Sequence, residues 1–207
     1  MLNFLFSDPF SFVIWAVAML VAISVHEAAH AWMAERLGDP TAKLQGRLTL
    51  NPLAHLDPIG TLMILLFRFG WGKPVPVDEY NLRYPRRDEA LISLAGPASN
   101  LVSASLLAIL TRITSFYFWL IPIIVLSVSL AIFNLIPIHP LDGGKILVGL
   151  LPHRLADEVE GVLNQYGFIL LIFLVFPFFG GNSPAISLIS PIINTILQIL
   201  LPNLPLV

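Results

Sequence analysis

The sequence predicts an all-α polytopic membrane protein with five spanning helices, a short re-entrant or interfacial segment and a small β-hairpin. Of its 207 residues, 57% are hydrophobic and only 12% are charged, whereas a soluble domain carries about 25% charged residues. Apolar runs long enough to cross a bilayer recur along the chain, and turn residues separate them. We expect spans at about residues 10–37, 86–113, 116–138, 162–180 and 185–201.

The first span has start and stop signals at its two ends. Ser7-Asp8-Pro9 supplies a capping side chain followed by proline in the first turn. Gly38-Asp39-Pro40 supplies a stop. The residues between these signals, about 28 at 1.5 Å each, give a helix of about 42 Å, which is enough to cross the hydrocarbon core and protrude.

Shorter elements are expected between the first two long spans. Lys43 to Asn51 alternates polar side chains with small or apolar ones, and a period of two predicts a strand or hairpin. Gly60 to Phe69 is apolar but too short to cross, which favours the re-entrant or interfacial segment within residues 43–70. Trp71 to Pro85 is rich in proline and mixed in charge, which is typical of a loop.

The later part of the chain divides into four segments. Only Thr114-Ser115 separates the second span from the third. The third ends in a break from Asn134 to Lys145 that contains two prolines and two glycines, and a broken helix is tolerated in a membrane where it lines a cavity. Residues 152–161 are polar and predict a short surface helix, and the last two spans contain no Asp, Glu, His, Lys or Arg.

The first span also contains two histidines and a glutamate, which are costly in a bilayer. Each ionisable group there costs about 2.5–3.5 kcal/mol on insertion scales, so its presence needs a reason. His26 and His30 are four residues apart and therefore share one helix face. With Glu27 they form the His-Glu-x-x-His zinc signature, in which the histidines bind the metal and the glutamate acts as general base. The alternative is that these histidines are ordinary hydrogen-bonded core residues.

A zinc site of this kind needs a third protein ligand. The chain has no cysteine, so thiolate ligands and disulfides are both excluded. Asp142 is the best candidate, because a carboxylate at the end of an apolar span is costly unless it is paired or coordinating. The alternative for Asp142 is a capping role or an ion pair with Lys145. The other candidate ligands are His55, Asp57, His139 and His153.

In these motifs the chain resembles the site-2 protease family of intramembrane zinc metalloproteases. The similarity lies in the His26–His30 signature, in Gly96-Pro97-Ala98-Ser99-Asn100 and in the break from Asn134 to Gly144. The runs Gly46 to Pro58 and Gly70 to Val77 also look like the family. The resemblance implies one zinc ion held by His26, His30 and Asp142, with Glu27 as base. It also implies regulated intramembrane proteolysis, the hydrolysis of a peptide bond within a transmembrane substrate helix.

Several further expectations accompany the resemblance. Asn134 could bind substrate by donating to its carbonyl, or could instead tie down the broken helix. The expected hairpin offers an edge on which an unwound substrate segment could pair. We expect a catalytic membrane core at residues 1–150, and a surface helix with two C-terminal spans at residues 151–207. The partners would be the lipid bilayer and a single-span membrane protein, and no basic patch suggests nucleic acid.

Charge distribution gives an orientation to these spans. The two halves of the ligand set meet only if the first and third spans run in the same direction, so Gly60 to Phe69 must not cross. Of the 11 Lys and Arg residues, only Arg112 then falls on the far side, and positive residues favour the cytoplasm. We expect a prokaryotic cell-membrane protein with its N-terminus outside and its active site near the cytoplasmic face. A metal-ion or proton transporter that uses the same cluster is the alternative function.

Overall fold

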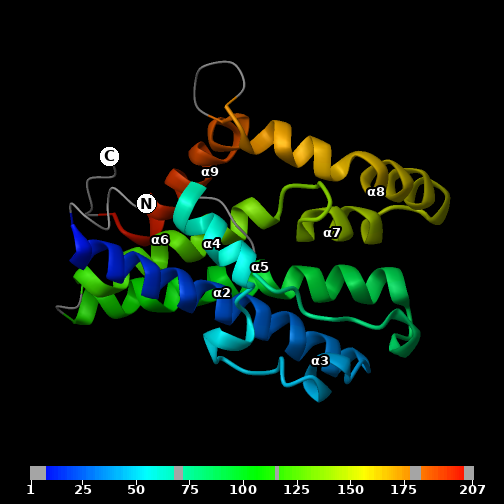
Figure 1. Ribbon diagram of the computed structural model, residues 1–207, viewed down its shortest axis with the longest axis horizontal. Coiled ribbons are helices and arrows are strands. Elements are labelled where there is room, and N and C mark those ends of the chain that lie inside the picture. The colour runs from blue at the N-terminus through cyan, green and yellow to red at the C-terminus, as the bar shows by residue number, and fades with distance from the viewer. Residues whose placement is uncertain (1–7, 68–71, 115–116, 178–182, 203–207) are drawn as a thin grey trace.

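The computed structural model describes residues 8–67, 72–114, 117–177 and 183–202 (Figure 1). Helix accounts for 78% of the structure, and the described residues contain no strand, which confirms the all-α prediction. The α-helices are α2 (Pro9–Leu37), α3 (Thr41–Leu44), α4 (Pro58–Phe67), α5 (Pro85–Ile113), α6 (Tyr117–Asn134), α7 (Asp142–Leu150), α8 (His153–Val175) and α9 (Pro184–Leu200). Two single turns of 3₁₀ helix, at Pro52–Ala54 and Glu79–Asn81, lie in the connections.

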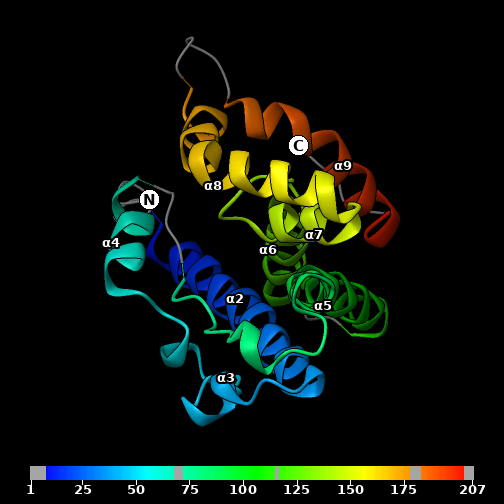
Figure 2. The same cartoon turned by 90° about the vertical axis from the view of Figure 1, so that its right-hand side faces the viewer.

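The long helices form a bundle around α5. This helix packs against α2, α6 and α7. Figures 1 and 2 show α8 and α9 on one side of this group and α3 on the other. A core of apolar side chains from α5, α6, α8 and α9 includes Ile124, Val128 and Leu171, all buried. The part of the chain before residue 68 is therefore joined to the rest mainly through α2.

Helix α2 begins and ends as its sequence signals predict. The carboxylate of Asp8 accepts a hydrogen bond of 3.1 Å from the backbone N–H of Ser11. Gly38 ends the helix with a φ of 109°, in the left-handed region that favours glycine. The side facing the bundle carries small residues, among them Ala18, Ala22 and Ala31. Small residues allow neighbouring helices to approach closely in a membrane protein.

A buried carboxylate follows the end of α2. Asp39 is fully buried and accepts hydrogen bonds from Thr41 N and Thr41 Oγ1, from Asp78 N at 2.8 Å and from Asn81 Nδ2 at 3.0 Å. Burial raises the pKa of the Asp39 carboxyl, but these hydrogen bonds outweigh burial and hold the pKa below its ordinary value of 3.8. Asp39 thereby joins the end of α2 to the segment that leads into α5.

The β-hairpin predicted at Lys43 to Asn51 is wrong. These residues are described throughout and form the end of α3 followed by turns, with Gly46 at a φ of 69°. Their period-two pattern does not reflect a buried sheet face, because Leu44 is 80% exposed and Leu50 66% exposed. The β-type pairing found among the described residues is an isolated antiparallel bridge between Leu56 and Gly72.

The remaining elements both confirm and correct the prediction. Helix α4 has ten residues, too few to span, as expected. Helix α8 is one continuous helix, so the division into a surface helix at 152–161 and a separate span is wrong. The change from polar to apolar composition occurs within this helix, and Gly161 does not interrupt it. The short helix α7 after the break was not predicted.

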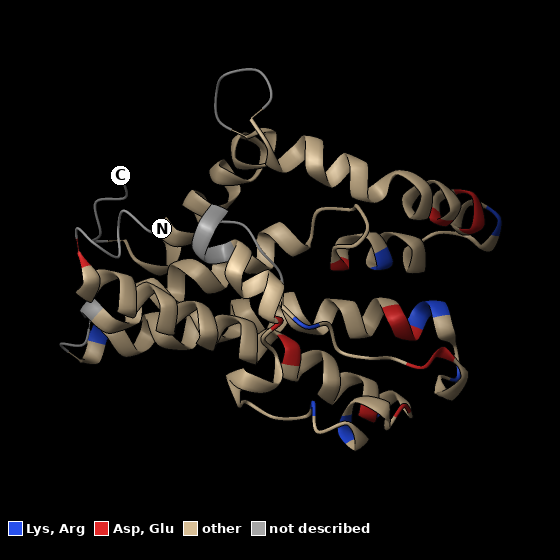
Figure 3. Cartoon of the chain, viewed as in Figure 1, with Lys and Arg blue, Asp and Glu red and all other residues tan. Residues whose placement is uncertain are grey.

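Three described helices, α2, α5 and α8, are long and apolar enough to cross a membrane. The apolar parts of α6 and α9, Trp119–Asn134 and Pro184–Leu200, are shorter. In Figure 3 most Lys, Arg, Asp and Glu residues lie toward one end of the molecule, where α3, the start of α5 and the start of α8 are found. The rest of the helical surface is largely uncharged, as expected for a protein surrounded by lipid.

Candidate metal centre

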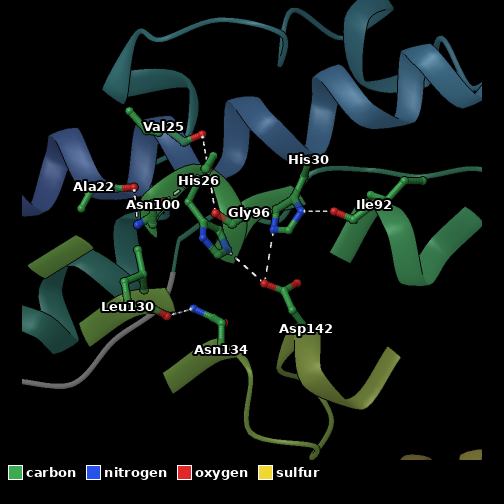
Figure 4. A network of polar contacts seen from close by, with 11 residues as sticks. Ala22, Val25, His26, His30, Ile92, Gly96, Asn100, Leu130, Asn134 and Asp142 are labelled. Carbon is green, nitrogen blue, oxygen red and sulfur yellow. Dashed lines mark hydrogen bonds and ion pairs between the residues drawn. The ribbon is translucent and has the colours of Figure 1, made fainter. Parts of the chain in front are cut away.

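The two histidines of the signature lie one helical turn apart on α2. His26 and His30 are both buried, with 4% and 7% of their surface exposed. Their rings meet edge to face, with centroids 4.6 Å apart and planes at 89°. Both Nε2 atoms therefore face the same point beside α5 (Figure 4).

Helix α5 provides both space and orientation for these rings. A Cβ atom on Gly96 would lie 2.5 Å from His30 Nε2 and 2.7 Å from His26 Cε1, so no larger residue fits without displacement. The carbonyl oxygen of Ile92 lies 2.7 Å from His30 Nδ1. Because a carbonyl can only accept, Nδ1 is the donor, and Nε2 of the neutral ring is left as a ligand atom.

The third member of the group, Asp142, begins α7. Its Oδ2 atom lies 3.0 Å from His26 Nε2 and 3.4 Å from His30 Nε2. A carboxylate in the first turn is favoured by the helix dipole. Gly143 lets α7 approach the preceding loop, because a Cβ there would be 2.3 Å from the Ile136 carbonyl oxygen. The Asp142 carboxylate thus meets His26, 116 residues earlier in the chain, where α7 packs closely on the preceding loop.

These three residues fit a zinc ion. One ligand atom from each lies within 4.8 Å of the others, and they are the one such group found among the described residues. Zinc bonds of about 2.0–2.1 Å in a tetrahedral site place ligand atoms about 3.3 Å apart, close to the separations from Asp142. The alternative pairing of Asp142 with Lys145 is not observed, because Lys145 Nζ contacts Glu89 Oε1 at 3.1 Å instead.

The other predicted residues lie outside this group. Glu27 follows His26 and is half-buried. Asn134 donates from Nδ2 to the Leu130 carbonyl oxygen at 3.0 Å, a bond within its own helix (Figure 4). His55 is fully buried and bonds the Thr49 carbonyl oxygen at 2.8 Å. His139 contacts Asn164 Oδ1 at 2.9 Å.

The remaining candidate ligands have structural contacts. Asp57 accepts a hydrogen bond from Gly60 N at 2.7 Å at the start of α4. His153 lies beside Arg86, with 3.3 Å between His153 Nδ1 and Arg86 Nη1. None of these contacts brings a further ligand to the three-residue group.

Sequence reasoning did not predict two residues near the site. The Ile92 carbonyl that orients His30 is a backbone group, so no side-chain pattern points to it. Asn100 is fully buried and donates from Nδ2 to the Ala22 carbonyl oxygen at 3.3 Å, which ties α5 to α2. Its amide within an apolar span was the signal that it has a buried partner.

Comparison with known proteins identifies the family. The model of peptidase family M50 matches residues 108–174, which include Asp142. "Putative zinc metalloprotease YwhC" of Bacillus subtilis is 39% identical over 175 residues, or 76% of this chain and 78% of that protein. The chain belongs to peptidase family M50. Rip2 of Mycolicibacterium smegmatis, which bears the same description, is 33% identical to this M50 peptidase over 179 residues, or 79% of this chain and 67% of Rip2.

The M50 relatives confirm the predicted site-2 protease family and the enzyme class. This M50 peptidase is a zinc-dependent metalloprotease and an integral membrane protein. The zinc metalloprotease RasP of Oceanobacillus iheyensis shares 37% identity over 86 residues, which cover 40% of this chain and 19% of RasP. No solved structure matches the chain significantly. The alternative of a transporter finds no support among these relatives.

Proposed function

We propose that this M50 peptidase performs regulated intramembrane proteolysis, cleaving a peptide bond within the transmembrane segment of a single-span membrane protein. In this proposal His26, His30 and Asp142 hold zinc, and Glu27 is the general base. The observation that carries it is the convergence of those three side chains between α2, α5 and α7. Two of these helices, α2 and α5, are long and apolar enough to cross a membrane, which supports a site between spanning helices.

The residues of the site divide the chemistry between them. When bound, Zn²⁺ supplies a Lewis acid that polarises the scissile carbonyl and makes water a stronger acid. The Ile92 carbonyl keeps His30 in the tautomer that presents Nε2. Glu27 takes a proton from the attacking water as the new C–O bond forms, and delivers it to the amine nitrogen when the C–N bond breaks.

Asn134 is proposed to bind the substrate by donating a hydrogen bond to a substrate carbonyl. Its Nδ2 group donates to Leu130 within α6, at the end of the helix that precedes the Asp142 loop. Contact with a substrate carbonyl would use the second N–H of this amide, since a side-chain amide carries two donors.

We also propose that α2, α5, α6, α8 and α9 all cross the membrane, with the N-terminus outside. Helix α4, with ten residues, does not cross. Helices α2 and α6 then run in the same direction, which agrees with the meeting of His26 and Asp142. The charged end of the molecule, visible in Figure 3, faces the cytoplasm because Lys and Arg favour that side.

Co-expression with candidate substrates tests the function directly. Single-span membrane proteins of the same cell, tagged at both ends, are expressed with the wild-type enzyme or with Glu27→Gln. A true substrate is cut within its apolar segment by the wild type. The Glu27→Gln variant should lower the cleavage rate by about 10²-fold or more. Cleavage only in soluble, water-exposed segments would contradict the proposed substrate class.

A further inference from the structure

A buried arginine lies in the loop that follows α3. Arg47 is only 4% exposed. Its Nη2 atom donates to the carbonyl oxygen of Lys73, and also to that of Pro74 at 3.3 Å. Its backbone N–H donates to the Ala42 carbonyl oxygen at 2.8 Å, so the arginine is anchored on α3. Arg47 therefore connects the α3 region to a segment 26 residues further along the chain.

A second set of contacts holds the same two segments together. The N–H of Lys73 donates to the His55 carbonyl oxygen at 2.8 Å, next to the bridge between Leu56 and Gly72. The His55 ring donates from Nε2 to the Thr49 carbonyl oxygen at 2.8 Å. Residues 72–74 are thus fixed from one end by His55 and from the other by Arg47.

The fixed segment lies against the proposed base. A Cβ atom on Gly72 would be 3.9 Å from Glu27 Oε1 and 3.6 Å from Ile23 Cγ2, both ordinary van der Waals distances. The backbone of Gly72 therefore occupies the space beside the Glu27 carboxylate. Any movement of residues 72–74 changes what surrounds this carboxylate.

Two nitrogen donors of the Arg47 guanidinium have no hydrogen-bond partner among the described residues. These donors are Nε and Nη1, and both are buried. Burial lowers the pKa of the Arg47 guanidinium, and the negative charge of Glu27 opposes that shift. A buried cation without a compensating anion is costly. Glu27 is the carboxylate whose charge acts on Arg47.

We propose that Arg47 is a positioning residue for peptide hydrolysis, holding residues 72–74 beside Glu27. This inference rests on the proposed function, because it assumes that Glu27 is the base. Within the described structure no hydrogen bond or ion pair joins Arg47 to the three ligand residues. Its effect is on the geometry in which Glu27 meets water and substrate, and such misplacement lowers turnover rather than metal binding.

Kinetics of purified, zinc-loaded variants tests the proposal. The substrate used is a single-span membrane protein that the wild type cleaves and the Glu27→Gln variant does not cleave efficiently in the co-expression experiment. We expect Arg47→Met to keep its zinc and to lower kcat at least about tenfold, with KM within about twofold. Arg47→Lys, whose ammonium can still donate to the two carbonyls, should recover most of that loss. Equal loss of zinc and kcat in Arg47→Met would overturn a positioning role.

A matched control separates positioning from general stability. Asp39→Ala removes another buried polar anchor, which holds Asp78 rather than residues 72–74, and should lower the melting temperature with kcat within about twofold. If Asp39→Ala lowers kcat as much as Arg47→Met does, Arg47 has only a structural role. If Glu27→Gln keeps full cleavage, the proposed function itself fails. If Glu27→Gln abolishes cleavage and Arg47→Met leaves kcat unchanged, only the role of Arg47 fails.

A spin label reports the geometry independently of activity. The chain has no cysteine, and the Lys73 side chain is exposed, so Lys73→Cys accepts a nitroxide. We expect the label to be more mobile in Arg47→Met than in the parent, and unchanged by Asp39→Ala. Equal mobility in the Arg47→Met variant and its parent would contradict the proposal that Arg47 holds residues 72–74 in place.

Discussion

The Asp142 carboxylate lies 3.0 Å from the Nε2 atom of His26, although 116 residues separate the two in the sequence. Helix α5 packs against both α2, which carries His26, and α7, which carries Asp142. Gly96 leaves room for both imidazole rings, and the Ile92 carbonyl fixes one of them. The centre is therefore a property of three packed helices rather than of the His-Glu-x-x-His motif alone.

Metal content tests the ligand set. We expect about one zinc per chain in the purified protein, and His26→Ala, His30→Ala and Asp142→Ala should each lower it strongly, because a catalytic site uses three protein ligands. Metal analysis by mass spectrometry measures this. Lys145→Ala is the control, since Lys145 pairs with Glu89 and not with Asp142. Full zinc occupancy in Asp142→Ala would remove that residue from the set.

Gly96→Ala should damage the centre although it replaces none of the ligand residues. The added Cβ would lie 2.5 Å from His30, so the ring or α5 must shift, and overpacking of this kind costs about 1–3 kcal/mol. We expect reduced zinc content and a lower melting temperature. In Gly161→Ala the new Cβ meets nothing within 4 Å, and we expect normal zinc content. Normal zinc in both variants would show that α5 does not confine the histidines.

Asp39 should make stability depend on pH at acid values. Its pKa is lowered in the folded protein, so its contribution is fully present above the unfolded pKa of about 3.9 and is lost as pH falls through the folded value. We expect Asp39→Asn to lower the free energy of unfolding by about 1.5–3 kcal/mol at pH 7. Melting temperatures of the variant and the wild type should converge as the pH falls below the unfolded pKa of about 3.9 and through the folded value. A difference that stays constant with pH would exclude a contribution from the carboxylate charge.

Cysteine labelling tests the orientation. Tyr80 is 99% exposed on the charged side of the molecule, and Thr114 follows the opposite end of α5. With a membrane-impermeant thiol reagent, Thr114→Cys should react in intact cells and Tyr80→Cys only after lysis. The cysteine-free parent gives the background. Labelling of Tyr80→Cys from outside would reverse the proposed topology.

The sequence predicts what depends on local chemistry. Asp8 and Gly38 mark the ends of α2 because capping is decided by neighbouring residues. His26, His30 and Asp142 were selected because charges in apolar spans need partners, and the structure brings them together. The spacing of the histidines and the cost of a buried charge were enough to select these residues, and their role as zinc ligands stays a prediction.

The errors arise where tertiary packing decides. The alternation of residues 43–51 suggested strands, but Arg47 is buried while Leu44 and Leu50 are largely exposed. The buried set is thus the reverse of what a hairpin with an apolar face requires. The polar start of α8 looked like a separate element, although a helix continues through a change of composition when no residue breaks it.

The position of Asp142 at the start of α7 has a consequence for biosynthesis. A growing chain that has reached residue 141 already contains both histidines and Glu27, but not the carboxylate. On the proposed ligand set it has two of the three protein ligands that a catalytic zinc site needs. On this proposal, a chain that has placed only α2, α5 and α6 in the bilayer lacks the complete ligand set, and cleavage waits until α7 folds.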